Sequence, residues 1–118
     1  MKFNEINNAI IAELNDDNLI ISQTQDILDL FGDLVYNNCN RIIIHKRNFH
    51  ENFFRLHTGI AGDILQKFSN YRIKLAIIGD FSEYKSKSLQ DFIRECNKGN
   101  SIFFLNSYDY AINRMTRK

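Results

Sequence analysis

Short runs of apolar, mostly β-branched residues recur along this chain and alternate with amphipathic segments. The clearest run, residues 41–45, reads Arg-Ile-Ile-Ile-His, and similar runs occupy residues 75–79 and 101–105. A run that is apolar on both faces is typical of a central strand covered by helices. We therefore expect three buried strands, the second of them starting near Arg72.

The amphipathic segments carry apolar residues at the spacing of a helix. Ser22-Gln23-Thr24-Gln25 has the pattern of a capping box, in which Ser22 accepts from the third helical amide while Gln25 reaches back. Another helix is expected to open at Ser88 and close at Gly99, and a last one to follow Ser107. The expected apolar helix faces contain Ile27, Leu28, Phe31, Leu34, Val35, Leu89, Phe92, Ile93, Ala111, Ile112 and Met115.

The N-terminal segment predicts antiparallel strands. Residues 2–6 and 9–14 are short apolar stretches split by Asn7-Asn8, and asparagine tolerates the positive φ of a tight hairpin. A further short strand is expected at residues 19–21. Strands that alternate with helices favour parallel pairing through right-handed crossovers.

The whole pattern predicts one α/β domain over residues 1–118. We expect a mixed, mainly parallel sheet of about five strands with an N-terminal hairpin, and about four helices. The residues expected in the core are Ile43, Ile64, Phe68, Ala76, Ile78, Phe92 and Phe103.

Composition narrows the class of protein. Of the residues, 44% are hydrophobic and 25% charged, and the net charge of +1 argues against a nucleic-acid partner, which needs a basic face. No apolar run approaches the ~20 residues of a membrane helix, and the N-terminus lacks a signal-peptide core. We therefore expect a cytoplasmic protein without a membrane partner. The abundance of Ile, Asn, Lys and Phe points to a bacterial source.

The cysteines and histidines do not form a recognisable site. Cys39 and Cys96 are too few and too isolated for a disulfide framework or a zinc site. His50 and His57 lie seven residues apart, but Glu51 alone is thin support for a metal centre. The sequence predicts neither a metal nor a cofactor.

Thr58-Gly59-Ile60-Ala61-Gly62 offers two interpretations. If a helix begins at Thr58, its first amides face outward and the glycines let an anion approach. Alternatively, Gly59, Ala61 and Gly62 are small so that the helix can lie tightly against the sheet, which is the interpretation we favour.

A second candidate site lies where the buried strands end. These ends carry His45, Asp80 and Asn106, and open α/β sheets bind ligands beyond the carboxyl ends of their strands. His45 and Asp80 could form an acid/base pair if they are adjacent. The alternative, which we favour, is that each residue is a cap or is solvated.

Residues 53–71 form an unusual block, Phe-Phe-Arg-Leu-His-Thr-Gly-Ile-Ala-Gly-Asp-Ile-Leu-Gln-Lys-Phe-Ser-Asn-Tyr, that runs into a strand ending in Gly79-Asp80-Phe81-Ser82. This block resembles the hallmark segment of the bacterial domain-of-unknown-function family 4180. At Arg55 and His57 the family pattern has an acidic and a basic residue instead. The resemblance implies a fold and a lineage, but no reaction. The matching positions include Phe53, Phe54, Thr58, Gly59, Ala61, Gly62, Ile64, Leu65, Gln66, Lys67, Phe68, Tyr71, Gly79, Asp80, Phe81, Ser86, Ser88, Phe92, Ile93, Glu95, Asn97 and Gly99.

The order of elements is also similar to that of anti-sigma-factor antagonist (STAS-type) domains. Those domains carry a Ser or Thr followed by Gly at a helix start, and Thr58-Gly59 lies in a comparable place. The resemblance implies a STAS-like regulatory or protein-interaction module, with a protein partner or a homodimer and with Thr58 as a switch. The alternative is a small-ligand-binding protein or enzyme with its site at the carboxyl ends of the parallel strands. The sequence leans away from an enzyme and assigns no catalytic residue.

Overall fold

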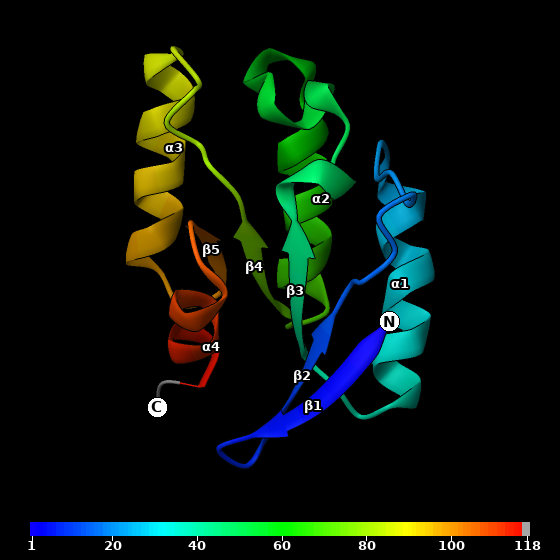
Figure 1. Cartoon of the computed structure of the whole chain (residues 1–118). Coiled ribbons are helices and arrows are strands. Elements are labelled where there is room, and N and C mark those ends of the chain that lie inside the picture. The colour runs from blue at the N-terminus through cyan, green and yellow to red at the C-terminus, as the bar shows by residue number, and fades with distance from the viewer. Residues whose placement is uncertain (117–118) are drawn as a thin grey trace.

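Five strands form one sheet in the order β1-β2-β3-β4-β5 (Figure 1). The computed structural model describes residues 1–116. The elements along the chain are β1 (Lys2–Ile6), β2 (Ala9–Glu13), α1 (Thr24–Tyr36), β3 (Arg41–His45), η1 (Lys46–Asn48), η2 (Glu51–Phe54), η3 (Leu56–Thr58), α2 (Ile60–Asn70), β4 (Lys74–Ile78), α3 (Lys87–Lys98), β5 (Ile102–Leu105) and α4 (Tyr108–Thr116). Strands β2 to β5 are parallel, and β1 is antiparallel to β2. The predicted single α/β domain with a mixed, mainly parallel sheet is confirmed.

The N-terminal hairpin forms as predicted. Asn7 and Asn8 connect β1 to β2 with φ angles of 53° and 67°. Such positive angles match the twist of the flanking strands, which is why asparagine is favoured in two-residue hairpin turns.

The strand predicted at residues 19–21 is wrong. Only an isolated β-bridge forms there, at Ile21. Asn48, whose side chain is buried, donates from Nδ2 to the carbonyls of Asp16 and Leu19, both at 2.9 Å. These bonds hold residues 15–20 as a turn, so the segment does not extend into a strand.

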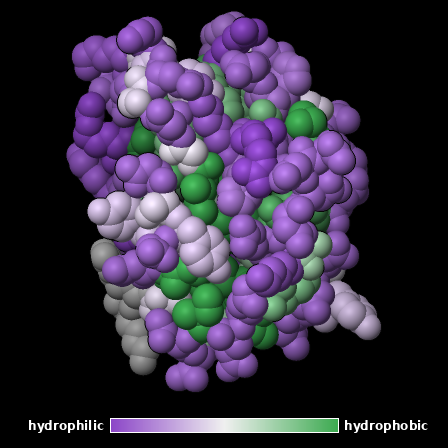
Figure 2. Space-filling model, viewed as in Figure 1, coloured by the Kyte–Doolittle hydropathy of each residue, from purple (hydrophilic) through white to green (hydrophobic). Residues whose placement is uncertain are grey.

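The helices cover the two faces of the sheet unequally. Helices α1, α2 and α3 contribute to the larger apolar cluster, whereas α4 contributes to a smaller cluster on the opposite face, the face nearest the viewer in Figure 1. That face is mostly hydrophilic, with apolar residues gathered in a band down its centre (Figure 2). Of the residues predicted to form the core, Ile43, Ile64, Phe68, Ala76 and Phe103 are buried, and Ile78 and Phe92 are half-buried.

The capping box predicted for α1 is wrong in its details. The Asp26 carboxylate accepts from the backbone amides of Ser22, at 2.9 Å, and Gln23, at 3.2 Å. A carboxylate satisfies free amides at a helix start and also suits the positive end of the helix, so it takes the role expected of Gln25. Val35, which was expected on the apolar face, is 68% exposed.

Two other boundaries also differ from the prediction. Ser86, and not Ser88, caps α3, with its Oγ accepting from the amide of Leu89 at 3.2 Å. Strand β4 begins at Lys74 because Arg72 has a φ of 56°, which a strand does not adopt.

Candidate pocket at the carboxyl edge of the sheet

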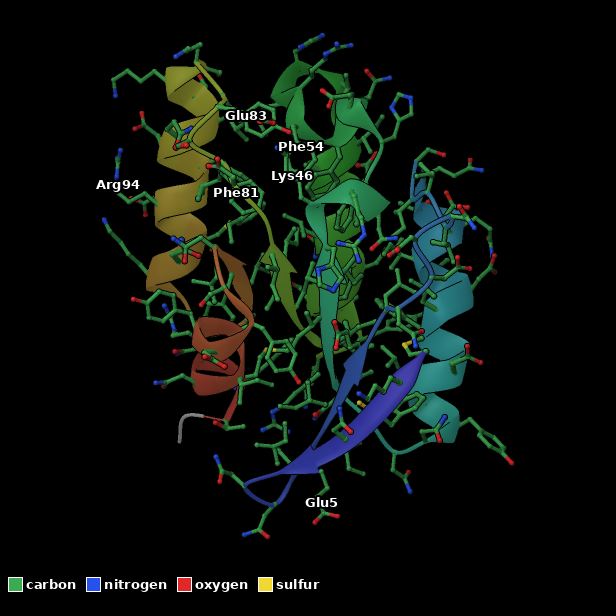
Figure 3. All side chains as sticks on the ribbon, in the orientation of Figure 1. Glu5, Lys46, Phe54, Phe81, Glu83 and Arg94 are labelled. Atoms are coloured by element: carbon green, nitrogen blue, oxygen red, sulfur yellow. The ribbon has the colours of Figure 1, made fainter. Side chains whose placement is uncertain are left out.

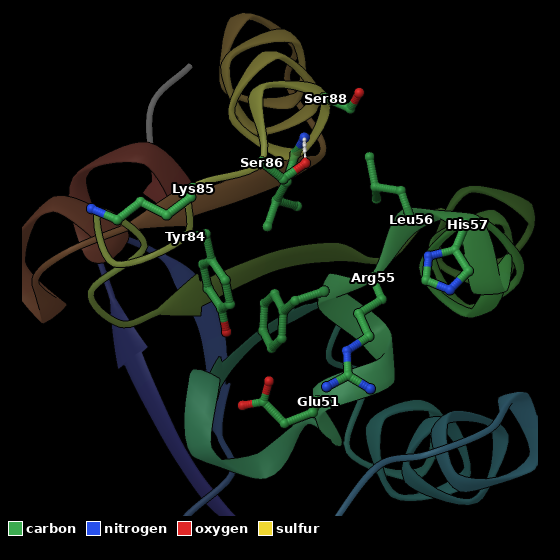
Figure 4. Close-up of a pocket in the computed structure, with 10 residues that line it drawn as sticks. Glu51, Arg55, Leu56, His57, Tyr84, Lys85, Ser86 and Ser88 are labelled. Atoms are coloured by element: carbon green, nitrogen blue, oxygen red, sulfur yellow. Dashed lines mark hydrogen bonds between the residues drawn. The ribbon is translucent and has the colours of Figure 1, made fainter.

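A pocket of about 490 Å³ opens beyond the carboxyl ends of β3 and β4. One wall is formed by the short helices η2 and η3, which follow β3, and the other by the loop after β4 and the first turn of α3 (Figure 4). The lining residues are Glu51, Phe54, Arg55, Leu56, His57, Tyr84, Lys85, Ser86, Ser88 and Leu89.

The inner part of the pocket is apolar and aromatic. The rings of Phe54 and Tyr84 are stacked, with their centroids 5.1 Å apart and an interplanar angle of 21°. Phe54 also packs edge-on against Phe53, at 5.0 Å, and Leu89 is buried beside it in the core. Because these side chains belong to the packed core, this wall of the pocket is fixed before any ligand arrives.

The outer part of the pocket is polar and carries more cations than carboxylates. Two cations, Arg55 and Lys85, line it together with one carboxylate, Glu51, and the imidazole of His57. Arg55 donates from Nη1 to the neutral Asn52 side chain, at 3.1 Å. Within residues 1–116, none of the three basic side chains has a carboxylate oxygen within 4.0 Å. The pocket therefore has an excess of positive charge.

Lys46 fastens the loop after β4 to the segment after β3. Its Nζ donates to the Asp80 carbonyl at 3.0 Å, forms an ion pair with Glu83, and lies 4.7 Å from the centre of the Tyr84 ring (Figure 3). Burial works to lower the pKa of Lys46, but its interactions with Glu83 and with Tyr84 outweigh burial and raise that pKa. Gly79 makes this approach possible, because a Cβ there would lie 2.5 Å from the Lys46 Cβ.

The Tyr84 hydroxyl is the one buried side-chain polar atom of residues 1–116 that has no hydrogen-bond partner. It points toward the side of the pocket where Glu51 lies (Figure 4). Burial raises the pKa of Tyr84 above its usual range. The Tyr84 hydroxyl therefore stays protonated at physiological pH, and its proton has no hydrogen-bond acceptor within residues 1–116.

The predicted Thr58-Gly59 site lies beside this pocket and does not line it. Helix α2 begins at Ile60 and not at Thr58, and Gly59 is its N-cap, with a φ of 77°. The Thr58 hydroxyl lies 2.8 Å from the carbonyls of Asn52 and Arg55, to which it can donate, and accepts from the amide of Ile60 at 3.3 Å. Thr58 thus ties η3 to the start of α2.

The close packing expected of the three small residues is found at Ala61, which is buried in the core, but is wrong for the two glycines. A Cβ built on Gly59 or on Gly62 would have no heavy atom within 4 Å, and both residues are exposed. Gly59 is explained by its positive φ, which glycine adopts at no steric cost. Nothing in the structure explains Gly62.

His45 and Asp80 are engaged separately. His45 Nε2 lies 2.8 Å from Glu13 Oε2, across the neighbouring strand β2. The Asp80 carboxylate accepts from the hydroxyl of Ser82, at 2.6 Å, and from its amide, at 3.0 Å, and these hydrogen bonds lower the pKa of Asp80. Asp80 instead shares a more open cavity of about 400 Å³ with Asn106.

The sequence correctly indicated the carboxyl edge of the parallel strands as the location of a cavity, but it did not indicate most of the residues that line the pocket. Ser88 was interpreted as a helix start, Ser86 was named only as a position that matches the family, and Tyr84 and Lys85 were not singled out. A signal was present: the loops after two adjacent parallel strands run to the same edge. The side chains that meet there depend on the path of residues 46–58, which has no periodic pattern.

Two further properties concern residues 1–116 only. No three His, Cys, Asp or Glu side chains gather there in a way that could hold a metal ion. Among the helices of this region, none combines the length and the hydropathy that crossing a membrane requires.

The fold and the pocket define a small α/β protein with a cavity at the carboxyl edge of a mainly parallel sheet. The family described as "Domain of unknown function (DUF4180)" matches residues 6–115, and the chain belongs to this family. The comparisons with curated proteins and with solved structures found no match. The resemblance to STAS-type domains therefore stays a prediction.

Proposed function

We propose that this protein is a ligand-binding module that holds a small molecule in the pocket between η2–η3 and the start of α3. The observation that carries the proposal is the pocket itself. Its volume of about 490 Å³ falls within the range of small-molecule sites, and apolar walls with a few convergent polar groups are typical of them. Its position beyond the parallel strands is where open α/β sheets bind ligands.

The test is an NMR titration of the ¹⁵N-labelled protein with a library of small aromatic fragments. We expect the fragments that bind to shift the amide signals of Leu56, Tyr84 and Leu89 and to leave those around Asp80 and Asn106 unchanged. Hits that scatter over the surface, or that prefer the cavity of Asp80, would contradict the proposal.

A matched pair of variants sharpens this test. Ser88→Trp places a large side chain at the pocket, whereas Ser69→Trp places the same side chain on an exposed position near the other end of α2. We expect the first variant to lose fragment binding and the second to keep it. Equal binding by both would place the ligand elsewhere.

A regulatory or protein-interaction role is the second candidate, and one specific observation favours it. Val35 and Tyr36, at the end of α1, are 68% and 88% exposed, and Tyr71, after α2, is 55% exposed. Tyr71 contacts Phe31, one helical turn before Val35, with ring centroids 5.1 Å apart. Exposed apolar side chains that gather in this way mark interaction surfaces.

This second candidate has its own test, which is independent of the pocket. If the surface around Tyr36 forms a homodimer, light scattering after size exclusion should give a mass that rises with concentration, and Tyr36→Ser should restore the monomer. A monomer at every concentration contradicts the homodimer. In this candidate Thr58 stays a proposed switch, and Thr58→Glu should then keep the fold while partner binding is lost.

A further inference from the structure

We propose that the pocket selects a small anion with a flat apolar body, which means an oxyanion attached to an aromatic ring. This inference rests on the proposed function and names the class of ligand. It follows from two properties of the same cavity: its inner wall is aromatic, and its outer wall carries positive charge that has no internal partner.

The aromatic wall determines the body of the ligand. Phe54 and Tyr84 present stacked rings, and Leu56 and Leu89 complete the apolar lining. Aromatic rings prefer offset-stacked or edge-to-face contacts with other rings. A flat ring buried against this pair therefore gains contact area without moving the core.

The charges determine the head group. Arg55 and Lys85 supply the positive charge of the lining, and among residues 1–116 Glu51 is the only carboxylate that lines the pocket. Lys85 has no hydrogen-bond partner within residues 1–116, and Arg55 contacts only a neutral amide there. Both residues are exposed, so their charges are accessible to an anion that enters the pocket. The guanidinium of Arg55 can also bind an oxyanion with two parallel hydrogen bonds.

Helix α3 adds hydrogen-bond donors on the same side of the pocket. Ser86, the N-cap of α3, and Ser88, in its first turn, belong to the lining of the pocket (Figure 4). Ser86 Oγ already accepts from the Leu89 amide, so its own proton is available to an acceptor. The first amides of a helix have no acceptor within the helix, which further suits an anion. These donors add to the positive charge that Arg55 supplies on one wall and Lys85 on the other.

The experiment compares four naphthalene derivatives by calorimetric titration of the whole chain. They are 2-naphthoate, 2-naphthyl phosphate, the neutral 2-naphthalenemethanol and the cationic 2-naphthylmethylamine. We expect both anions to bind at least about tenfold more tightly than the alcohol, the equivalent of one strong charge-assisted contact, and the amine to bind most weakly. The tighter of the two anions identifies the head group as carboxylate or phosphate.

Variants assign the effect to the pocket. Lys85→Gln and Arg55→Gln should each weaken binding of the better anion by about five- to tenfold and leave binding of the alcohol unchanged. Arg94→Gln is the control, since Arg94 lies on α3, points away from the pocket and pairs with Asp91 (Figure 3). It should change nothing.

The outcomes separate the two proposals. If the alcohol binds as tightly as the anions, the charge inference is overturned and the ligand-binding proposal stands. If none of the four compounds binds, while the fragment library also gives no hit at the pocket, both proposals fail. If Arg94→Gln weakens the anions as much as Lys85→Gln does, the preference comes from overall charge, and the inference is overturned.

Discussion

Gly59 and Gly62 lie three residues apart and illustrate how differently two glycines behave. Gly59 has a φ of 77°, whereas Gly62 lies in the first turn of α2 with ordinary helical geometry, and neither has a neighbour near its missing Cβ. From the sequence both looked like packing residues. The left-handed angle at Gly59 depends on the turn between η3 and α2, and no spacing rule predicts that turn.

This difference gives a prediction with an internal control. Gly59→Ala should lower the free energy of unfolding by roughly 1–2 kcal/mol, because a Cβ in the left-handed region meets the following carbonyl. Gly62→Ala should raise it by about 0.5–1 kcal/mol, because glycine is a poor helix former. Urea titration of both variants measures this. Equal effects of the same sign would show that the backbone angle at Gly59 is not what the position requires.

Phe68 was predicted as a core residue from helical spacing, and it is 1% exposed, with its ring 5.0 Å from that of Phe31. Phe68→Ala should cost roughly 3–5 kcal/mol in unfolding free energy, since it removes a large buried side chain and leaves a cavity. Tyr36→Ala, at a position that is 88% exposed, should change stability little. A Phe68→Ala variant as stable as the parent in urea would contradict the packing of α2 against α1.

At the scale of elements, the strands were easier to predict than the starts of the helices. Residues 41–45 and 101–105 are apolar runs in the sequence, and burial on both faces is visible in that pattern alone. The predicted helix starts were wrong because this chain has many residues whose side chains can cap a helix. Asp26 takes the capping role that was predicted for Gln25, and Ser86 takes the role that was predicted for Ser88. The path of the preceding loop determines which side-chain oxygen reaches a free backbone amide.

The outer edge of β5 is stabilised by a side chain that makes the hydrogen bonds a neighbouring strand would make. Asn97, near the end of α3, accepts from the Phe104 amide at 2.7 Å and donates to the Phe104 carbonyl at 3.1 Å. It thereby satisfies both backbone groups of Phe104 on the outer edge of β5, the last strand of the sheet. An unpaired edge would otherwise be open to another chain.

Asn97→Ala should therefore lower the free energy of unfolding by about 1–3 kcal/mol, because it leaves half-buried backbone groups without partners. Hydrogen exchange at the Phe104 amide should also become faster. Asn113→Ala, at an exposed position on α4, is the control and should do neither. Unchanged protection of Phe104 in the Asn97 variant would show that the strand edge is held by other contacts.

At the scale of the whole molecule, the alternation of strands and helices was sufficient to predict a mainly parallel sheet. It was also sufficient to predict which edge would carry a pocket, because loops after parallel strands gather at one end. The residues at that edge were a different matter. The side chain of His45 contacts Glu13, and that of Asp80 accepts a hydrogen bond from Ser82. The rings of Phe54 and Tyr84, which are thirty residues apart in the sequence, stack on each other. Only the three-dimensional path of two irregular loops brings them into contact.

The central claim is that this edge holds an aromatic anion, and a crystal structure of the protein with 2-naphthoate tests it most directly. The account predicts naphthalene density against the Phe54 and Tyr84 rings, with the carboxylate within hydrogen-bond distance of Arg55 or Lys85. Naphthoate bound in the cavity of Asp80 and Asn106, or bound in the pocket with its carboxylate turned away from both cations, would contradict the claim.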